Sequence, residues 1–125
     1  MKAVPLALAL LAIAGCATFK NSPSPAELTS ADYAPAPTQY EQTIRRYFDE
    51  VSKDPSAIQY REISQPEKWW LRDSRGLVNG GDRFLYGWLV RATVNGKNSF
   101  GGYVGFKTYG FLFKGEEIVK VVEPE

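Results

Sequence analysis

Between Phe84 and Asn95, apolar side chains occupy every second position, and this alternation limits the folds open to the chain more than any other feature. The apolar positions are Phe84, Tyr86, Trp88, Val90, Ala92 and Val94. Successive side chains of a β-strand point to opposite faces of a sheet, so the pattern predicts a long strand with one buried face. Such a strand needs neighbouring strands and a second layer that covers its apolar face.

A return strand is predicted over residues 103–113, and the turn that leads to it has two candidate positions. Asn95-Gly96 is a preferred dipeptide for a two-residue hairpin turn, but that register places Val94 opposite Lys97. Cross-strand neighbours on one face match in character, which favours a longer loop over residues 98–102. The pairs expected from the longer loop are Val94 with Phe106, Ala92 with Thr108, Trp88 with Leu112, and Thr93 with Lys107 on the outer face.

Upstream of these strands, apolar residues recur at helical spacing over residues 39–52. The expected apolar stripe consists of Tyr40, Ile44, Tyr47, Phe48 and Val51. Thr38 and Glu41 have the spacing of a capping box, in which each side chain accepts a hydrogen bond from the other residue's backbone amide. Asp54-Pro55 ends the helix, because the residue before a proline avoids helical geometry.

Shorter strands are predicted at residues 57–63, 67–71 and 117–122. A loop is expected over residues 72–82, where Asn79-Gly80-Gly81-Asp82 is a turn sequence. We therefore expect an α+β fold, in which one N-terminal amphipathic helix packs on an antiparallel sheet of three to five strands.

The stretch that leads to Cys16 has the organisation of a signal peptide. Lys2 supplies a positive charge, residues 3–14 are apolar apart from a backbone break at Pro5, and the small Gly15 precedes the only cysteine. The apolar run is too short to cross a bilayer as a helix. A thiolate is a strong nucleophile, so Cys16 is suited to accepting a lipid.

Ile13-Ala14-Gly15-Cys16 resembles the lipobox of bacterial lipoproteins. The resemblance implies that Cys16 receives a diacylglyceryl group, that residues 1–15 are removed and that the new amine is acylated. It implies a place in the cell envelope, and Ala17, where an aspartate would favour the inner membrane, favours the outer membrane with the domain facing the periplasm. An ordinary secretory signal and an uncleaved hydrophobic tail are the alternative interpretations.

Three segments follow from these patterns. Residues 1–15 form the signal peptide, residues 16–37 form the lipidated cysteine with a flexible tether of Pro, Ser and Ala, and residues 38–125 form a single α+β domain. The tether has too few apolar side chains to offset the entropy lost on ordering.

Part of the domain also resembles a segment of small uncharacterised bacterial lipoproteins and secreted proteins. The residues that carry this resemblance are Asp54-Pro55-Ser56, Gly87-Trp88-Leu89-Val90 and Val94-Asn95-Gly96-Lys97-Asn98-Ser99-Phe100-Gly101-Gly102-Tyr103. The resemblance implies no activity.

Composition argues against an enzyme and against a nucleic-acid partner. The chain has no His, which removes the usual general base and the commonest metal ligand, and neither a metal nor another cofactor is expected. The one thiol is assigned to the lipid, so a disulfide is excluded. Without Lys2, the 15 basic residues become 14 and balance the 14 acidic residues. A net charge near zero disfavours binding to nucleic acid.

Five residues are candidates for binding: Trp69, Trp70, Asn98, Phe100 and Tyr103. Adjacent tryptophans can stack on sugars or peptides, although one in the core and one over a sheet edge is the commoner arrangement. The loop at residues 98–103 presents the aromatic ring of Phe100 beside exposed backbone amides, although a plain hairpin tip accounts for the same residues.

We therefore expect a membrane-anchored bacterial lipoprotein that contacts membrane lipid through acylated Cys16. Its non-enzymatic periplasmic domain serves envelope structure or binds an envelope protein. The alternative is a periplasmic inhibitor or exclusion factor that acts through the loop at residues 98–103.

Overall fold

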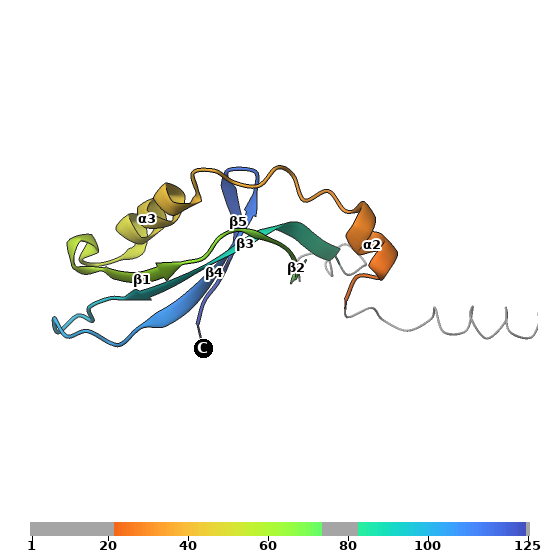
Figure 1. The fold of residues 1–125 in the computed structure, drawn as a ribbon. Helices are drawn as coiled ribbons and strands as arrows, with labels where there is room; N and C mark the ends of the chain where they lie inside the picture. Colours follow the sequence, from red (N-terminus) through yellow and green to blue (C-terminus); the bar gives the residue numbers. More distant parts are fainter. Residues whose placement is uncertain (1–21, 74–82, 125) are drawn as a thin grey trace, which may run out of the picture. The chain divides into compact units, whose positions relative to one another are not determined.

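The computed structural model describes residues 22–73 and 83–124 (Figure 1). Its elements are α2 (Pro25–Ser30), α3 (Tyr40–Val51), the short 3-10 helix η1 (Pro55–Ala57), β1 (Gln59–Ile63), β2 (Glu67–Asp73), β3 (Arg83–Asn95), β4 (Lys107–Lys114) and β5 (Glu117–Val122). The chain divides into two units, residues 1–29 with 72–84 and residues 30–71 with 85–125, and each is described by itself.

The strands form one five-stranded sheet in the order β1-β3-β4-β5, and β2 also pairs with β3. Ser64 lies at the break between β1 and β2. Its amide donates to the Arg91 carbonyl oxygen at 2.8 Å, and its hydroxyl accepts from the Arg91 amide at 2.9 Å. The hydroxyl therefore satisfies a backbone amide where the ladder is interrupted. The expected α+β class, a helix on an antiparallel sheet, is confirmed.

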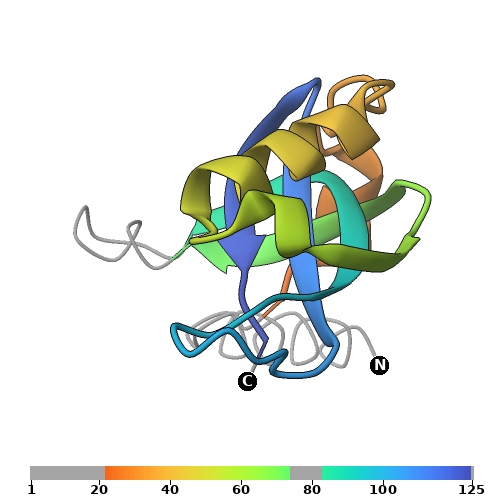
Figure 2. The same cartoon turned by 90° about the vertical axis from the view of Figure 1, so that its left-hand side faces the viewer.

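Aromatic and aliphatic side chains of α3, β3 and β4 form the core. Figure 2 shows α3 lying across one face of the sheet. There Ile44 and Phe48 are buried with Val90 and Phe111. The Phe48 ring meets four other rings edge to face, with centroid separations of 5.2 Å to Tyr47, 6.1 Å to Tyr60, 5.1 Å to Tyr109 and 5.8 Å to Phe111. These contacts combine apolar burial with the ring geometry that aromatic pairs prefer.

Two details of the predicted core are wrong. Val51, the last member of the helical stripe, is 58% exposed, because the final turn of α3 borders an open groove rather than the sheet. Leu89 belongs to the opposite face of β3, which the alternation left to solvent, and yet it is 5% exposed. Its partner in the ladder is Leu112, which is fully buried, so both faces of the sheet carry buried residues here.

The β3–β4 hairpin uses the longer loop, as predicted, but the register of its strands differs by one residue from the expected one. The observed pairs include Val94 with Lys107, Thr93 with Thr108, Ala92 with Tyr109, Val90 with Phe111 and Trp88 with Phe113. Phe111 and Phe113 therefore face the core, where the expected register had placed Leu112. On the outer face, the hydroxyls of Thr93 and Thr108 lie 2.8 Å apart and hydrogen-bond across the strands.

The cause of the shift is an irregularity at Gly105. At the tip, Lys97 bridges to Tyr103, which is the register expected from the sequence. Gly105 then takes a φ of 105°, a conformation that favours glycine, and its amide donates to the Asn95 side-chain oxygen at 2.9 Å. One extra residue is thereby accommodated on the returning strand, as in a β-bulge.

The predicted return strand at residues 103–113 is too long at its start, because β4 begins at Lys107, whereas most other boundaries agree with prediction. The last strand, β5, begins and ends where it was expected, and β1 lies within its predicted range. β2 continues through Arg72 and Asp73, so the predicted loop at 72–82 is too long at its start. The predicted turn at residues 79–82 lies outside the described residues.

The capping box predicted at Thr38 and Glu41 is wrong. The carboxylate of Glu116, from the turn between β4 and β5, instead accepts hydrogen bonds from the amides of Thr38 and Gln39 and from the Thr38 hydroxyl, at 2.9 to 3.0 Å. These bonds hold the pKa of Glu116 below its ordinary value of 4.5, the backbone bonds to Gln39 and Thr38 contributing most. A residue far along the chain therefore satisfies the start of α3.

This contact predicts a pH-dependent contribution to stability. Because the folded-state pKa of Glu116 is lowered, its contribution is fully present above pH 4.5 and is lost as the pH falls through the folded-state value. We expect Glu116→Gln to lower the free energy of unfolding in urea at pH 7 and to lower it less as the pH falls below 4.5. The adjacent exposed Glu117, changed to Gln, is the control. Equal effects of the two substitutions at pH 7 would contradict the contact.

A capping box does occur at α2, where the sequence analysis did not place one. The Ser24 amide donates to the Glu27 carboxylate at 2.8 Å, and the Glu27 amide donates to the Ser24 hydroxyl at 3.2 Å. Two amides at the start of this short helix are thereby satisfied reciprocally.

Residues 32–34, which precede the predicted domain boundary at Thr38, contact the sheet. The Trp88 indole donates to the Ala34 carbonyl oxygen at 2.8 Å, and the Tyr33 and Tyr86 rings meet edge to face at 5.7 Å. Lys114 donates to the Asp32 carbonyl oxygen. Residues 32–34, which the sequence analysis assigned to the flexible tether, therefore pack against the sheet.

Candidate functional site

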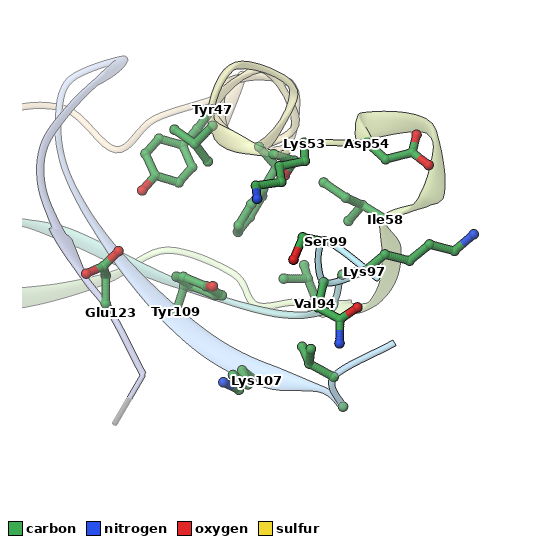
Figure 3. A pocket seen from close by; sticks show the side chains of 17 residues that line it. Tyr47, Lys53, Asp54, Ile58, Val94, Lys97, Ser99, Lys107, Tyr109 and Glu123 are labelled. Atoms are coloured by element: carbon green, nitrogen blue, oxygen red, sulfur yellow. The ribbon is translucent and has the colours of Figure 1, made fainter. Parts of the chain in front are cut away.

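A groove of about 510 Å³ lies between the end of α3, η1 and the hairpin arm (Figure 3). We use "arm" for residues 96–106, which link β3 to β4. The helix ends at Val51 because Asp54-Pro55 follows, and η1 then turns the chain towards β1. The groove thus arises where the helix stops and the hairpin continues.

The lining of the groove combines an apolar floor with an exposed apolar rim. Phe48, Ile58 and Val94 line it, and Phe48 and Val94 belong to the buried core. At the rim, Val51 is 58% exposed and Val104 is 51% exposed. Apolar side chains exposed on both sides of one depression are typical of a surface that another molecule covers.

Charged groups of both signs surround this lining. Lys53, Lys97 and Lys107 contribute ammonium groups, and Asp54 and Glu123 contribute carboxylates. Figure 3 shows these side chains around the groove. The arrangement suits a ligand with several polar contacts better than a simple anion, because acids and bases are interspersed.

Tyr47 and Tyr109 supply hydroxyl groups to the same groove. Burial raises the pKa of the Tyr47 phenol, and the nearby Glu123 carboxylate and Tyr109 add to the effect. The Tyr47 hydroxyl therefore stays protonated around neutral pH, the state in which a phenol can donate a hydrogen bond.

The tip of the arm is ordered by its own hydrogen bonds. The Asn98 side-chain oxygen accepts from the amides of Phe100 at 2.9 Å and Gly102 at 3.1 Å. Gly101 adopts a φ of 83°, which glycine tolerates without steric strain. Asn98 therefore serves the geometry of the turn, as the plain hairpin interpretation holds, while Phe100 is left 94% exposed.

Tyr103 joins the arm to the rest of the sheet unit. Its hydroxyl donates to the Ala57 carbonyl oxygen in η1 at 2.9 Å, and the Lys97 ammonium lies 5.4 Å from its ring centroid. The side chain is 45% exposed. Tyr103 thus links the two walls of the groove, although it does not itself line it.

The two tryptophans are not part of this site. Trp69 is 41% exposed on β2, where the Arg91 guanidinium lies 5.4 Å from its ring and also pairs with Glu67. Trp70 is partly buried in the same strand. Of the five predicted binding residues, only Asn98 lines the groove, and Cys16 lies outside the described residues.

Sequence reasoning missed the groove residues of α3 and η1. Ile58 falls in the strand predicted at residues 57–63, Lys53 follows the predicted helix, and nothing local links either residue to Val104. Val51 gave the only indication of this groove in the sequence. It is the last residue of the apolar stripe and lies just before Asp54-Pro55, where a helix can extend past the edge of its sheet.

Comparisons with protein-family models, with curated protein sequences and with solved structures gave no match. Within residues 22–73 and 83–124, no helix combines the length and the apolar character needed to cross a bilayer. The same residues contain no cluster of three or more His, Cys, Asp or Glu side chains arranged to hold a metal ion.

Proposed function

We propose that the protein is a lipid-anchored component of a bacterial cell envelope whose domain, without enzymatic activity, binds another envelope protein. The lipobox-like Ile13-Ala14-Gly15-Cys16 supports the anchor. Two or three acyl chains on Cys16 would hold the chain at a membrane, whereas one chain binds only marginally. Absence of an aspartate after Cys16 favours the outer membrane, with the domain facing the periplasm.

The groove beside the arm is the observation that carries the binding role. Its rim exposes Val51 and Val104, and its polar groups include three ammonium groups, two carboxylates and two phenols. An apolar centre with a polar surround is the usual composition of a protein–protein contact surface. Because Tyr103 ties the arm to η1, the surface is formed before a partner arrives, which reduces the entropy lost on binding.

The anchor has a direct test. In bacterial cells given a palmitate analogue, we expect the chain to carry the label and its Cys16→Ser variant to lack it. Mass spectrometry of the labelled chain should show a sequence that begins at residue 16. A Cys16→Ala variant controls for effects of the serine hydroxyl. Label that persists in either variant, or residues 1–15 still attached to the natural product, would contradict the proposal.

The exposure of Phe100 favours a second candidate function. A rigid turn that carries an aromatic ring 94% exposed resembles the inserting loop of an inhibitor, so a periplasmic exclusion factor acting through residues 98–103 is the alternative. Capture of one hydrolase or one phage protein, lost on Phe100→Ala but kept on Val104→Asp, would support this alternative. Capture that depends on Val104 instead would support the groove.

A further inference from the structure

The arm is exposed along most of its length, although hydrogen bonds order its turn. Every residue from position 97 to position 108 is exposed, and Figure 1 shows the arm extending beyond the start of β1. Four of these residues are large and apolar. Their exposed fractions are 94% for Phe100, 51% for Val104, 45% for Tyr103 and 38% for Phe106. Exposed apolar residues gathered on one projection, rather than scattered singly, indicate a contact surface.

The charges on the arm and at its junction with β4 are all positive. Lys97 is the only charged residue of the arm, Lys107 follows it as the first residue of β4, and the sequence has no acidic residue between positions 95 and 107. Arg61 of β1 places its guanidinium 3.9 Å from the centroid of the Phe106 ring, which adds a third cation beside the arm. Of the two acidic residues that line the groove, Asp54 accepts a hydrogen bond from the Ser56 hydroxyl. The arm therefore complements a surface that is both apolar and anionic.

We infer that the tip of the arm docks on a lipid bilayer that contains anionic lipids, with Phe100 inserted at the boundary between headgroups and acyl chains. Aromatic rings concentrate at this boundary, and basic side chains beside them interact with anionic headgroups. The inference rests on the proposed anchor, which keeps the tip at a high effective concentration over the membrane.

A bilayer fits this tip better than the cleft of a protein partner does. The Phe100 ring lies in the exposed turn at the tip of the arm, and Lys97 and Lys107 flank that turn along the chain. The turn is held by Asn98 and Gly101, so the exposed ring loses little conformational freedom on insertion. The groove, which lies on the side of the arm, remains accessible to a protein.

Quenching of tryptophan fluorescence in vesicles tests this inference. The full chain carrying Phe100→Trp is isolated from cell membranes and reconstituted into vesicles of phosphatidylcholine with phosphatidylglycerol, whose acyl chains carry bromine. We expect the introduced tryptophan to be quenched, above the level of the parent chain with its three native tryptophans. Each basic residue near an anionic surface contributes about fivefold in affinity, so adding Lys97→Gln and Lys107→Gln should lower the insertion equilibrium about 25-fold.

The control is Val119→Trp, since Val119 is 41% exposed on β5 and lies outside the arm. Equal quenching of Phe100→Trp and Val119→Trp would overturn the inference. A tryptophan at position 100 that stays unquenched in the vesicles would also overturn the inference. If that tryptophan becomes shielded when extracted envelope proteins are added, the result would instead support the exclusion factor. A failure of the proposed anchor is detected separately by flotation of the vesicles in a density gradient, because a chain without the anchor does not float with them.

Discussion

Replacing Gly87 with alanine is expected to destabilise the protein by about 3 kcal/mol, at the upper end of the range for overpacked sites. A Cβ atom at Gly87 would lie 2.2 Å from the Phe113 carbonyl oxygen and 3.3 Å from the Leu112 Cγ. The first of these is a backbone atom in a central strand, so it cannot move aside as a flexible side chain would. Relief of the overlap requires β3 and β4 to separate, which disturbs the core around Phe113.

Thermal and urea denaturation measure this effect. A loss of about 3 kcal/mol corresponds to a Tm lowered by roughly 12–24 °C for a domain of this size. Gly96→Ala is the matched control, because no atom lies within 4 Å of the added Cβ and the change should stay within about 0.5 kcal/mol. If the two alanine variants are equally stable, β3 and β4 do not approach each other closely at Gly87.

Removal of the Phe111 ring is expected to have an effect at least as large. Phe111 is fully buried, with the Tyr47 and Phe48 rings edge to face at 5.2 and 5.8 Å and the Tyr109 ring stacked at 6.4 Å. Phe111→Ala leaves a cavity beneath α3, which typically costs about 3–5 kcal/mol. Urea denaturation followed by far-UV circular dichroism would measure the loss.

Phe106→Ala is the control, and together the two substitutions test the register of the hairpin. Phe106 is 38% exposed and contacts the Arg61 guanidinium, so its removal should cost no more than about 1 kcal/mol. The register expected from the sequence places Phe106 opposite Val94 on the core face instead. A Phe106→Ala variant less stable than Phe111→Ala would therefore favour that register over the observed one.

Much of the fold follows from patterns that are local in the sequence. The alternation after Phe84 predicts β3, and the helical spacing before Asp54-Pro55 predicts α3. Gly115, with a φ of 64°, stands between the strands predicted at residues 103–113 and 117–122. Each pattern depends on the geometry of a few neighbouring residues, and burial of one face then selects helix or strand. The Asn98 turn is of the same kind.

Features that join distant residues could not be read in this way. The capping box at Thr38 looked complete, but Glu116, 78 residues further along, takes its place. The register of the hairpin depended on Gly105, whose backbone conformation a one-dimensional pattern does not record. An isolated tryptophan pair likewise gave no indication that Trp69 lies beside Arg91.

The features of the candidate site also fall into those that the sequence predicts and those that depend on the tertiary structure. The sequence alone determined that residues 98–103 form a loop with an aromatic ring, that Cys16 stands in a lipobox-like sequence, and that an α+β domain follows. Only the tertiary structure placed Val51 and Lys53 opposite Val104 to form a groove, and left Phe100 exposed on a projecting arm. The physical reason is that local hydrogen bonds and spacing specify elements, whereas a binding surface depends on where those elements end relative to one another after packing.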